Sequence, residues 1–205
     1  MKKVNRLFLV MMLMTTAIMA KAADNATTIL DKAAATYTKS GDVKIGFTIA
    51  VNGQSSKGQI NLSGQKFLCS TGGSVAWFDG KTMWHYVKNN EEVNITNPSD
   101  KEIARMNPYH FLNIYKKGNG YKSTVKKTTA TEYHILLTGK KGSTYNSIEV
   151  HLNKSTYQLS YVKLVSSKRS AEITVNSYLK NQKFPASMFT FNKKEYPSAE
   201  IVDLR

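Results

Sequence analysis

The stretch VKIGFTIAVNG, residues 43–53, decides the fold class. Its apolar residues occupy every second position from Val43 to Val51, and the residues between them are small or polar. A period of two is typical of a β-strand with one buried face. The Asn52-Gly53 pair that follows favours a tight hairpin turn, so we expect an antiparallel partner strand directly after it.

The same alternation continues along most of the chain. β-branched or aromatic residues return at every second position, and Asp79-Gly80 marks another hairpin. Because short turns join consecutive strands, the expected topology is an antiparallel meander. The further strands are predicted at residues 60–62, 66–71, 74–78, 81–87, 92–96, 121–127, 132–138, 145–152, 157–165 and 171–179.

Two helical stretches interrupt this pattern. Residues 25–41 carry one apolar stripe at helical spacing, with Asn25 or Thr27 as the cap and Gly41 as the stop. A second helix is predicted from Asn107-Pro108 to Gly118. Two short helices cannot cover a sheet of this size, which leaves a sandwich, a closed barrel or an incomplete barrel. We expect a mainly β fold with a few helices, an incomplete antiparallel β-barrel of about 10–11 strands closed by an α-helical lid.

The N-terminal segment is interpreted as a secretory signal peptide. Basic residues within positions 2–6 precede the apolar run of residues 7–20, and Ala20-Lys21-Ala22 supplies a small-x-small cleavage pattern. The apolar run is shorter than the about 20 residues that a membrane-spanning helix needs. We therefore expect cleavage near Ala22, export to the periplasm, and a single domain over residues 23–205.

Composition and charge limit the classes of partner. With 41% hydrophobic and 21% charged residues, the 205-residue chain is not intrinsically disordered. It carries 29 basic and 14 acidic residues, and loss of the four basic residues in positions 1–22 leaves 25 against 14, a net charge of +11. Since these charges are spread along turns and solvent faces, and export removes the protein from the cytoplasm, no nucleic acid partner is expected. A basic surface favours brief encounters with anionic lipid headgroups.

The motifs of common enzymes are absent from the sequence. It contains no G-x-S-x-G elbow, phosphate-binding loop or dinucleotide fingerprint, and no obvious acid–base carboxylate pair, so we do not expect an enzyme. Cys69 is interpreted as a buried or half-buried thiol without a role. The histidines have no metal-ligand spacing, those on strands are expected to face solvent, and neither a metal site nor a cofactor is predicted. These histidines are His85, His110, His134 and His151.

Several motifs resemble one known family. Residues 75–86, VAWFDGKTMWHY, resemble the D-G-K-T-x-W-x-Y hairpin of the periplasmic outer-membrane lipoprotein carrier proteins of the LolA type. Phe189-Thr190-Phe191-Asn192 is similar to the F-T-F motif near the family's C terminus, and Val202-Asp203-Leu204 fits its ending. Residues 107–112, NPYHFL, occupy the place of the family's internal lid helix. The matches follow the family order over nearly all of the expected mature chain.

The resemblance implies a monomeric carrier that holds lipoprotein acyl chains between the inner and outer membranes. It implies acylated lipoproteins as cargo, an ATP-driven lipoprotein extractor in the inner membrane and an acceptor at the outer membrane. The family's well-studied members also carry an arginine after the second strand that latches the lid. Residues 62–66, LSGQK, contain no arginine here, so the latch must be different, weaker or absent.

A carrier of acyl chains needs an adaptable apolar cavity, and alternate strand residues are candidates for its wall. The lid is expected to pack into the empty cavity and to swing out on loading, and ordinary core packing is the competing explanation for every candidate. A periplasmic carrier or sensor of another amphiphile, such as a free glycolipid, is the alternative function, and an enzyme or a structural scaffold is the third. The predicted wall residues are Phe47, Ile49, Trp77, Trp84, Tyr86, Ile148, Val150, Tyr161 and Ile173, and the predicted lid residues are Phe111, Leu112 and Tyr115.

Overall fold

The computed structural model describes residues 25–100, 102–103 and 120–205. The expected signal peptide and the helix predicted at residues 107–118 lie outside the described residues. The helix α1 (Ala26–Thr38) precedes the strands β1 (Asp42–Val51), β2 (Gln54–Ser63), β3 (Lys66–Thr71), β4 (Ser74–Phe78), β5 (Met83–Val87), β6 (Glu92–Thr96), β7 (Tyr121–Thr128), β8 (Glu132–Gly139), β9 (Ser147–Asn153), β10 (Leu159–Val165), β11 (Ser170–Gln182) and β12 (Glu200–Asp203). Short 3-10 turns lie at η1 (Lys88–Asn90), η3 (Ala186–Phe189) and η4 (Lys193–Glu195).

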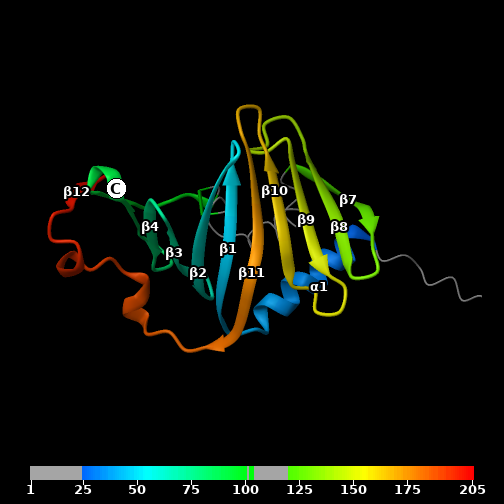
Figure 1. Ribbon diagram of the computed structural model, residues 1–205, viewed down its shortest axis with the longest axis horizontal. Coiled ribbons are helices and arrows are strands. Elements are labelled where there is room, and N and C mark those ends of the chain that lie inside the picture. The colour runs from blue at the N-terminus through cyan, green and yellow to red at the C-terminus, as the bar shows by residue number, and fades with distance from the viewer. Residues whose placement is uncertain (1–24, 101, 104–119) are drawn as a thin grey trace, which may run out of the picture.

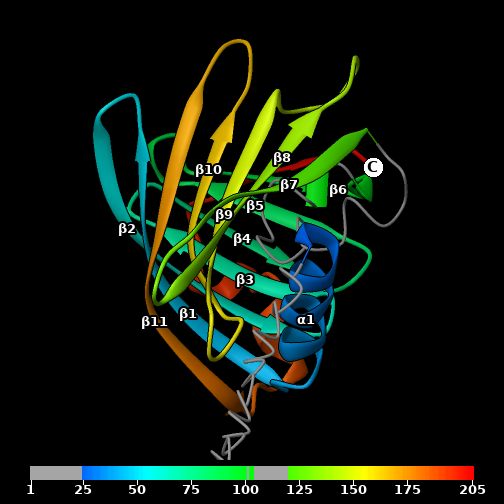
Figure 2. The ribbon, with the colours of Figure 1, turned by 90° about the vertical axis from the view of Figure 1, so that its right-hand side faces the viewer.

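The twelve strands of the described residues form one open sheet, in the order β12-β6-β5-β4-β3-β2-β1-β11-β10-β9-β8-β7. The part of this order from β4 to β7 runs from left to right in Figure 1. The predicted meander is therefore two meanders, β1–β6 and β7–β11, which meet where β1 pairs with β11. Neighbouring strands are antiparallel except β12, which pairs with β6 in parallel. The sheet curls without closing, and the prediction of a mainly β incomplete barrel is confirmed (Figure 2).

Helix α1 lies inside the curve of the sheet (Figure 2). The side-chain oxygen of Asn25 accepts a hydrogen bond of 2.8 Å from the backbone N–H of Thr28, which caps the helix as predicted. The apolar stripe of α1 is buried against the sheet at Ala26, Ile29, Leu30, Ala33 and Ala34. We call the face of the sheet that packs against α1 the inner face, and the opposite one the outer face.

The main core lies on the inner face. Because side chains alternate between the two faces of a strand, Val43, Ile45 and Phe47 of β1 reach this core together with apolar residues of the strands on both sides. Phe67 of β3 and Phe78 of β4 pack there with ring centroids 5.4 Å apart. Within the described part of the chain, no helix has the length and apolar character that crossing a membrane requires.

A second, smaller core lies on the outer face of β3–β6. The segment after β11 returns across β3 and β4 through η3, so that Phe189 is fully buried. Trp77 packs edge-on against Phe191 and Tyr196, with ring centroids 5.6 and 5.4 Å away. Strands β4 and β5 are therefore covered on both faces.

Candidate functional site

Apolar side chains form continuous rows across the inner face. The antiparallel register of β1, β11, β10, β9 and β8 places one apolar residue of each strand beside the next. The two rows, from β1 to β8, are Ile49–Ile173–Val162–Val150–Ile135 and Val51–Ala171–Leu164–Ile148–Leu137.

Burial changes along these rows. Ile148 and Val150 are 0% exposed and belong to the core around α1. Ile49 and Ile173, at the β1–β11 end, are only half-buried, as is Phe47 beside them. The inner face thus offers accessible apolar surface where β1 meets β11. We call this surface the β1–β11 patch, which consists of Phe47, Ile49, Val51, Ala171, Ile173 and Val175.

A glycine positions the aromatic ring of this patch. Gly58 of β2 is the cross-strand partner of Phe47, and the ring lies over the place where a side chain at residue 58 would stand. A Cβ atom there would be 2.4 Å from Cζ of Phe47 and 2.9 Å from the backbone oxygen of Ser70. The absence of a side chain at Gly58 therefore leaves the space that the Phe47 ring occupies over β2.

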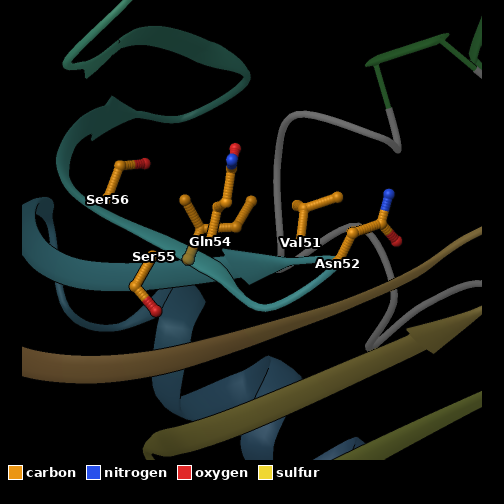
Figure 3. A pocket seen from close by; sticks show the side chains of 6 residues that line it. Val51, Asn52, Gln54, Ser55 and Ser56 are labelled. Carbon is orange, nitrogen blue, oxygen red and sulfur yellow. The ribbon is translucent and has the colours of Figure 1, made fainter.

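A pocket of about 350 Å³ opens beside the patch, at the turn between β1 and β2. Its apolar side is formed by Ile49 and Val51, and its polar residues follow the turn (Figure 3). The polar residues are Asn52, Gln54, Ser55 and Ser56.

The predicted hairpin turn is confirmed at this pocket, with Asn52 and Gly53 both at positive φ, +51° and +82°. Cross-strand pairing places Gln54 opposite Val51 and Ser56 opposite Ile49. A pocket with apolar residues on one side and polar residues on the other can bind both the apolar chain and the polar end of one amphiphile.

Five of the nine predicted wall residues share the inner face, and Trp77, Trp84 and Tyr86 do not. Trp77 and Trp84 are cross-strand partners on the outer face, where the ring of Tyr86 lies 4.8 Å from that of Tyr196. These three residues cannot line the same wall as Phe47. Since β4 and β5 are covered on both faces, the alternation of aromatic residues does not reveal which face is the inner one.

Tyr161 also lies on the outer face. The pairing of β10 with β9 shifts by one residue between Leu159 and Tyr161. This β-bulge turns Val162 and Leu164 inward, although Tyr161 is in phase with the buried Leu159 in the sequence. A one-residue shift reverses the facing of all later positions, and the sequence carries no clear signal for it.

The predicted lid residues Phe111, Leu112 and Tyr115 lie outside the described residues, and the lid stays a prediction. In residues 62–66 the resemblance implies an arginine that latches the lid. The structure instead joins this segment to helix α1 by a hydrogen bond. The hydroxyl of Tyr37 in α1 donates a 3.1 Å hydrogen bond to the backbone oxygen of Gly64. Burial, with smaller contributions from Tyr178 and Asp42, raises the pKa of Tyr37 to about 12. This hydrogen bond of Tyr37 was not predicted from the sequence.

The strand histidines do not all face solvent as predicted. His85 is half-buried on the inner face, opposite the core residue Ala76, and burial lowers its pKa. His134 and His151 lie on the outer face, where they contact each other and retain only 16% and 19% of their side-chain exposure.

Comparisons with known proteins agree with this architecture. The family described as outer membrane lipoprotein carrier protein LolA matches residues 16–168. No curated protein sequence matches the chain.

Solved structures extend the comparison to the fold. A crystal structure of an uncharacterized conserved protein from Thermus thermophilus superposes with a TM-score of 0.61 at 11% identity, covering 87% of this chain and 98% of the other. A LolA superfamily protein from Nitrosomonas europaea gives a TM-score of 0.45 at 13% identity, with 82% and 99% covered. The MucA/MucB complex from Pseudomonas aeruginosa contains a chain with a TM-score of 0.45 at 13% identity, with 86% and 63% covered.

Proposed function

The chain belongs to the outer membrane lipoprotein carrier protein LolA family, and from this membership we propose that it is a periplasmic carrier that binds lipoprotein acyl chains and moves lipoproteins from the inner to the outer membrane. The observation that carries the proposal is the β1–β11 patch. Its side chains pair in register, Phe47 with Val175, Ile49 with Ile173 and Val51 with Ala171, and they remain half-buried.

The energetics of lipid transfer explain what such a patch would do. Moving an acyl chain of roughly fifteen methylenes from a bilayer into water costs on the order of 12 kcal/mol, at about 0.8 kcal/mol per methylene. Apolar protein surface in place of water removes most of this cost. Since an acyl chain has no polar groups to recognise, aliphatic side chains such as Ile49 and Ile173 are suitable contacts, and the polar residues at the β1–β2 turn would face the cargo's polar end.

The partners in this proposal are an ATP-driven extractor in the inner membrane, which loads the carrier, and an acceptor at the outer membrane, which unloads it. Export through cleavage near Ala22 places the protein between the two membranes. The protein acts by binding and needs no catalytic chemistry or cofactor. A lid formed by residues 107–118 would close the cavity, with Phe111, Leu112 and Tyr115 facing it.

Mass spectrometry of ligands that co-purify with the protein from native periplasm tests the cargo class. We expect acylated polypeptides. Free glycolipid or another free lipid in their place would refute lipoprotein carriage and favour the alternative, a carrier or sensor of a different amphiphile. The absence of any bound amphiphile would contradict both functions.

A matched pair of variants on β11 tests the site. Ile173 lies in the β1–β11 patch, whereas Leu179 lies on the same strand, is 50% exposed and pairs with Lys44 outside the patch. We expect Ile173→Ser to weaken the binding of a fluorescent acyl-chain probe and Leu179→Ser to leave it unchanged. Equal effects of the two substitutions, measured per folded molecule, would exclude the patch as the binding site.

A further inference from the structure

Two histidines from neighbouring strands stack on the outer face, away from the β1–β11 patch. His134 of β8 and His151 of β9 are cross-strand partners, and their rings are nearly parallel, with centroids 3.6 Å apart and an interplanar angle of 6°. Glu132, two residues before His134, lies on the same face. Over residues 25–100, 102–103 and 120–205, this is the one place where three potential metal ligands converge, with their ligand atoms all within 4.8 Å of one another.

The separations of these atoms suit a common metal ion. Oε2 of Glu132 lies 3.3 Å from Nε2 of His134 and 3.9 Å from Nδ1 of His151. Nitrogen and oxygen ligands bind zinc at about 2.0–2.2 Å, so two ligands of a tetrahedral ion are about 3.3–3.5 Å apart. One ion could bind all three once one of the two stacked imidazoles turns about its side-chain bonds, so that both ring nitrogens point at the ion.

Neighbouring groups already orient two of the three ligands. Nε2 of His151 lies 3.1 Å from Oε1 of Glu149, which leaves Nδ1 directed toward Glu132. Lys126 donates a 2.7 Å hydrogen bond to the other oxygen of Glu149. Such a carboxylate behind a ligating imidazole is the usual outer-shell arrangement in protein metal sites.

Glu132 is held in a similar way. Its Oε1 accepts a 2.6 Å hydrogen bond from the hydroxyl of Ser160 on β10, so that Oε2 is the oxygen turned toward the histidines. The cluster thus combines ligands from β8 and β9 with a support from β10. The partial exposure of its side chains leaves access for an ion from solvent.

We propose that Glu132, His134 and His151 form a binding site for one divalent transition-metal ion of the zinc class. Two imidazole nitrogens with one carboxylate oxygen form a ligand set that zinc-class ions accept, whereas calcium and magnesium bind through oxygen ligands. The ion would join β8 to β9 on the face opposite the acyl-chain site. The sequence does not reveal this site, because His134 and His151 lie on different strands and meet only through the β8–β9 pairing.

Isothermal titration of the untagged, chelator-treated protein with Zn²⁺ tests the site. We expect one ion per chain, and loss of a ligand in His151→Gln should lower the affinity by about 100-fold or more, since loss of an outer-shell partner alone costs 10–100-fold. The matched control is His85→Gln, which removes an imidazole from the inner face and should leave the affinity unchanged.

Two further measurements keep the test decisive if a variant is unstable. Glu132→Gln should weaken zinc binding while circular dichroism shows an unchanged fold. Zinc should raise the thermal unfolding midpoint of the wild type and of His85→Gln, but not that of His151→Gln. Absence of saturable zinc binding by the wild type, or equal affinities for the wild type and a folded His151→Gln or Glu132→Gln, would overturn the proposal.

Discussion

Replacing Gly58 by alanine should destabilise the protein through the Phe47 ring. The added Cβ would lie 2.4 Å from Cζ of Phe47 and 2.9 Å from the backbone oxygen of Ser70. Comfortable carbon–carbon contacts are about 3.5–4.0 Å, so the ring must move by more than about 1 Å. The Ser70 oxygen belongs to β3 and cannot yield in the same way. Overpacking of this kind costs about 1–3 kcal/mol.

Urea unfolding followed by tryptophan fluorescence measures this loss of free energy. Gly72→Ala is the matched control, because a Cβ at residue 72 would meet no atom within 4 Å. It should change the free energy of unfolding by less than about 0.5 kcal/mol. The displaced Phe47 ring should also alter the β1–β11 patch, so Gly58→Ala should change the binding of an acyl-chain probe.

A double-mutant cycle separates the ring from other causes. If the Phe47 ring is responsible, combining Gly58→Ala with Phe47→Leu should recover part of the lost stability, with an interaction energy of about 0.5 kcal/mol or more. Strictly additive effects of the two substitutions, or equal stabilities of Gly58→Ala and Gly72→Ala, would refute this account of how Gly58 positions Phe47.

Three further predictions concern other parts of the fold. Tyr37→Phe removes the hydrogen bond to Gly64 and should lower the free energy of unfolding by about 1 kcal/mol at neutral pH. Because the pKa of Tyr37 is raised from 10.0 to about 12, its contribution is present below pH 10 and disappears as pH rises through 12, so the wild type should lose more stability over that interval than the variant. Burial raises the pKa of the Cys69 thiol to about 11, so alkylation by iodoacetamide should be slow at pH 8 and should keep accelerating up to pH 11; rapid alkylation at pH 8 would contradict its burial. Asp79→Ala removes the carboxylate oxygen that accepts from the backbone N–H of Thr82, 2.8 Å away, and should cost about 0.5–2 kcal/mol in urea unfolding, whereas Asp79→Asn should retain most of the stability.

The architecture could be predicted from the sequence because most strands bury one main face. The alternation in residues 43–51 predicts β1, and the Asn52-Gly53 pair predicts its hairpin. The apolar stripe of α1, with Asn25 as the cap, predicts the helix that packs on the inner face. Strand β12 was missed because Glu200–Asp203 is short, largely exposed and paired in parallel with β6. Nothing local marks such a strand, since its partner is far away in the sequence.

The candidate site was predicted only in part, for a different physical reason. Phe47, Ile49 and Ile173, predicted for the cavity wall, do lie on the inner face, because β1 and β11 have one polar face; their role in binding stays a prediction. Trp77 and Tyr161 were assigned to the wrong face, the first because β4 is buried on both sides and the second because a bulge shifts the register of β10. Gly58 carries no side chain, so its effect on the position of the Phe47 ring becomes visible only in the structure.

The seam between β1 and β11 has a consequence for how the molecule forms. Asp42 and Gln182 are partners in this seam, so β1 cannot complete its ladder of hydrogen bonds until nearly the whole polypeptide is available. Contacts of such long range slow folding, and until they form, β1 presents an unpaired edge to other chains. A newly synthesised molecule would therefore pass through a period of vulnerability to self-association that ends when β11 pairs with β1.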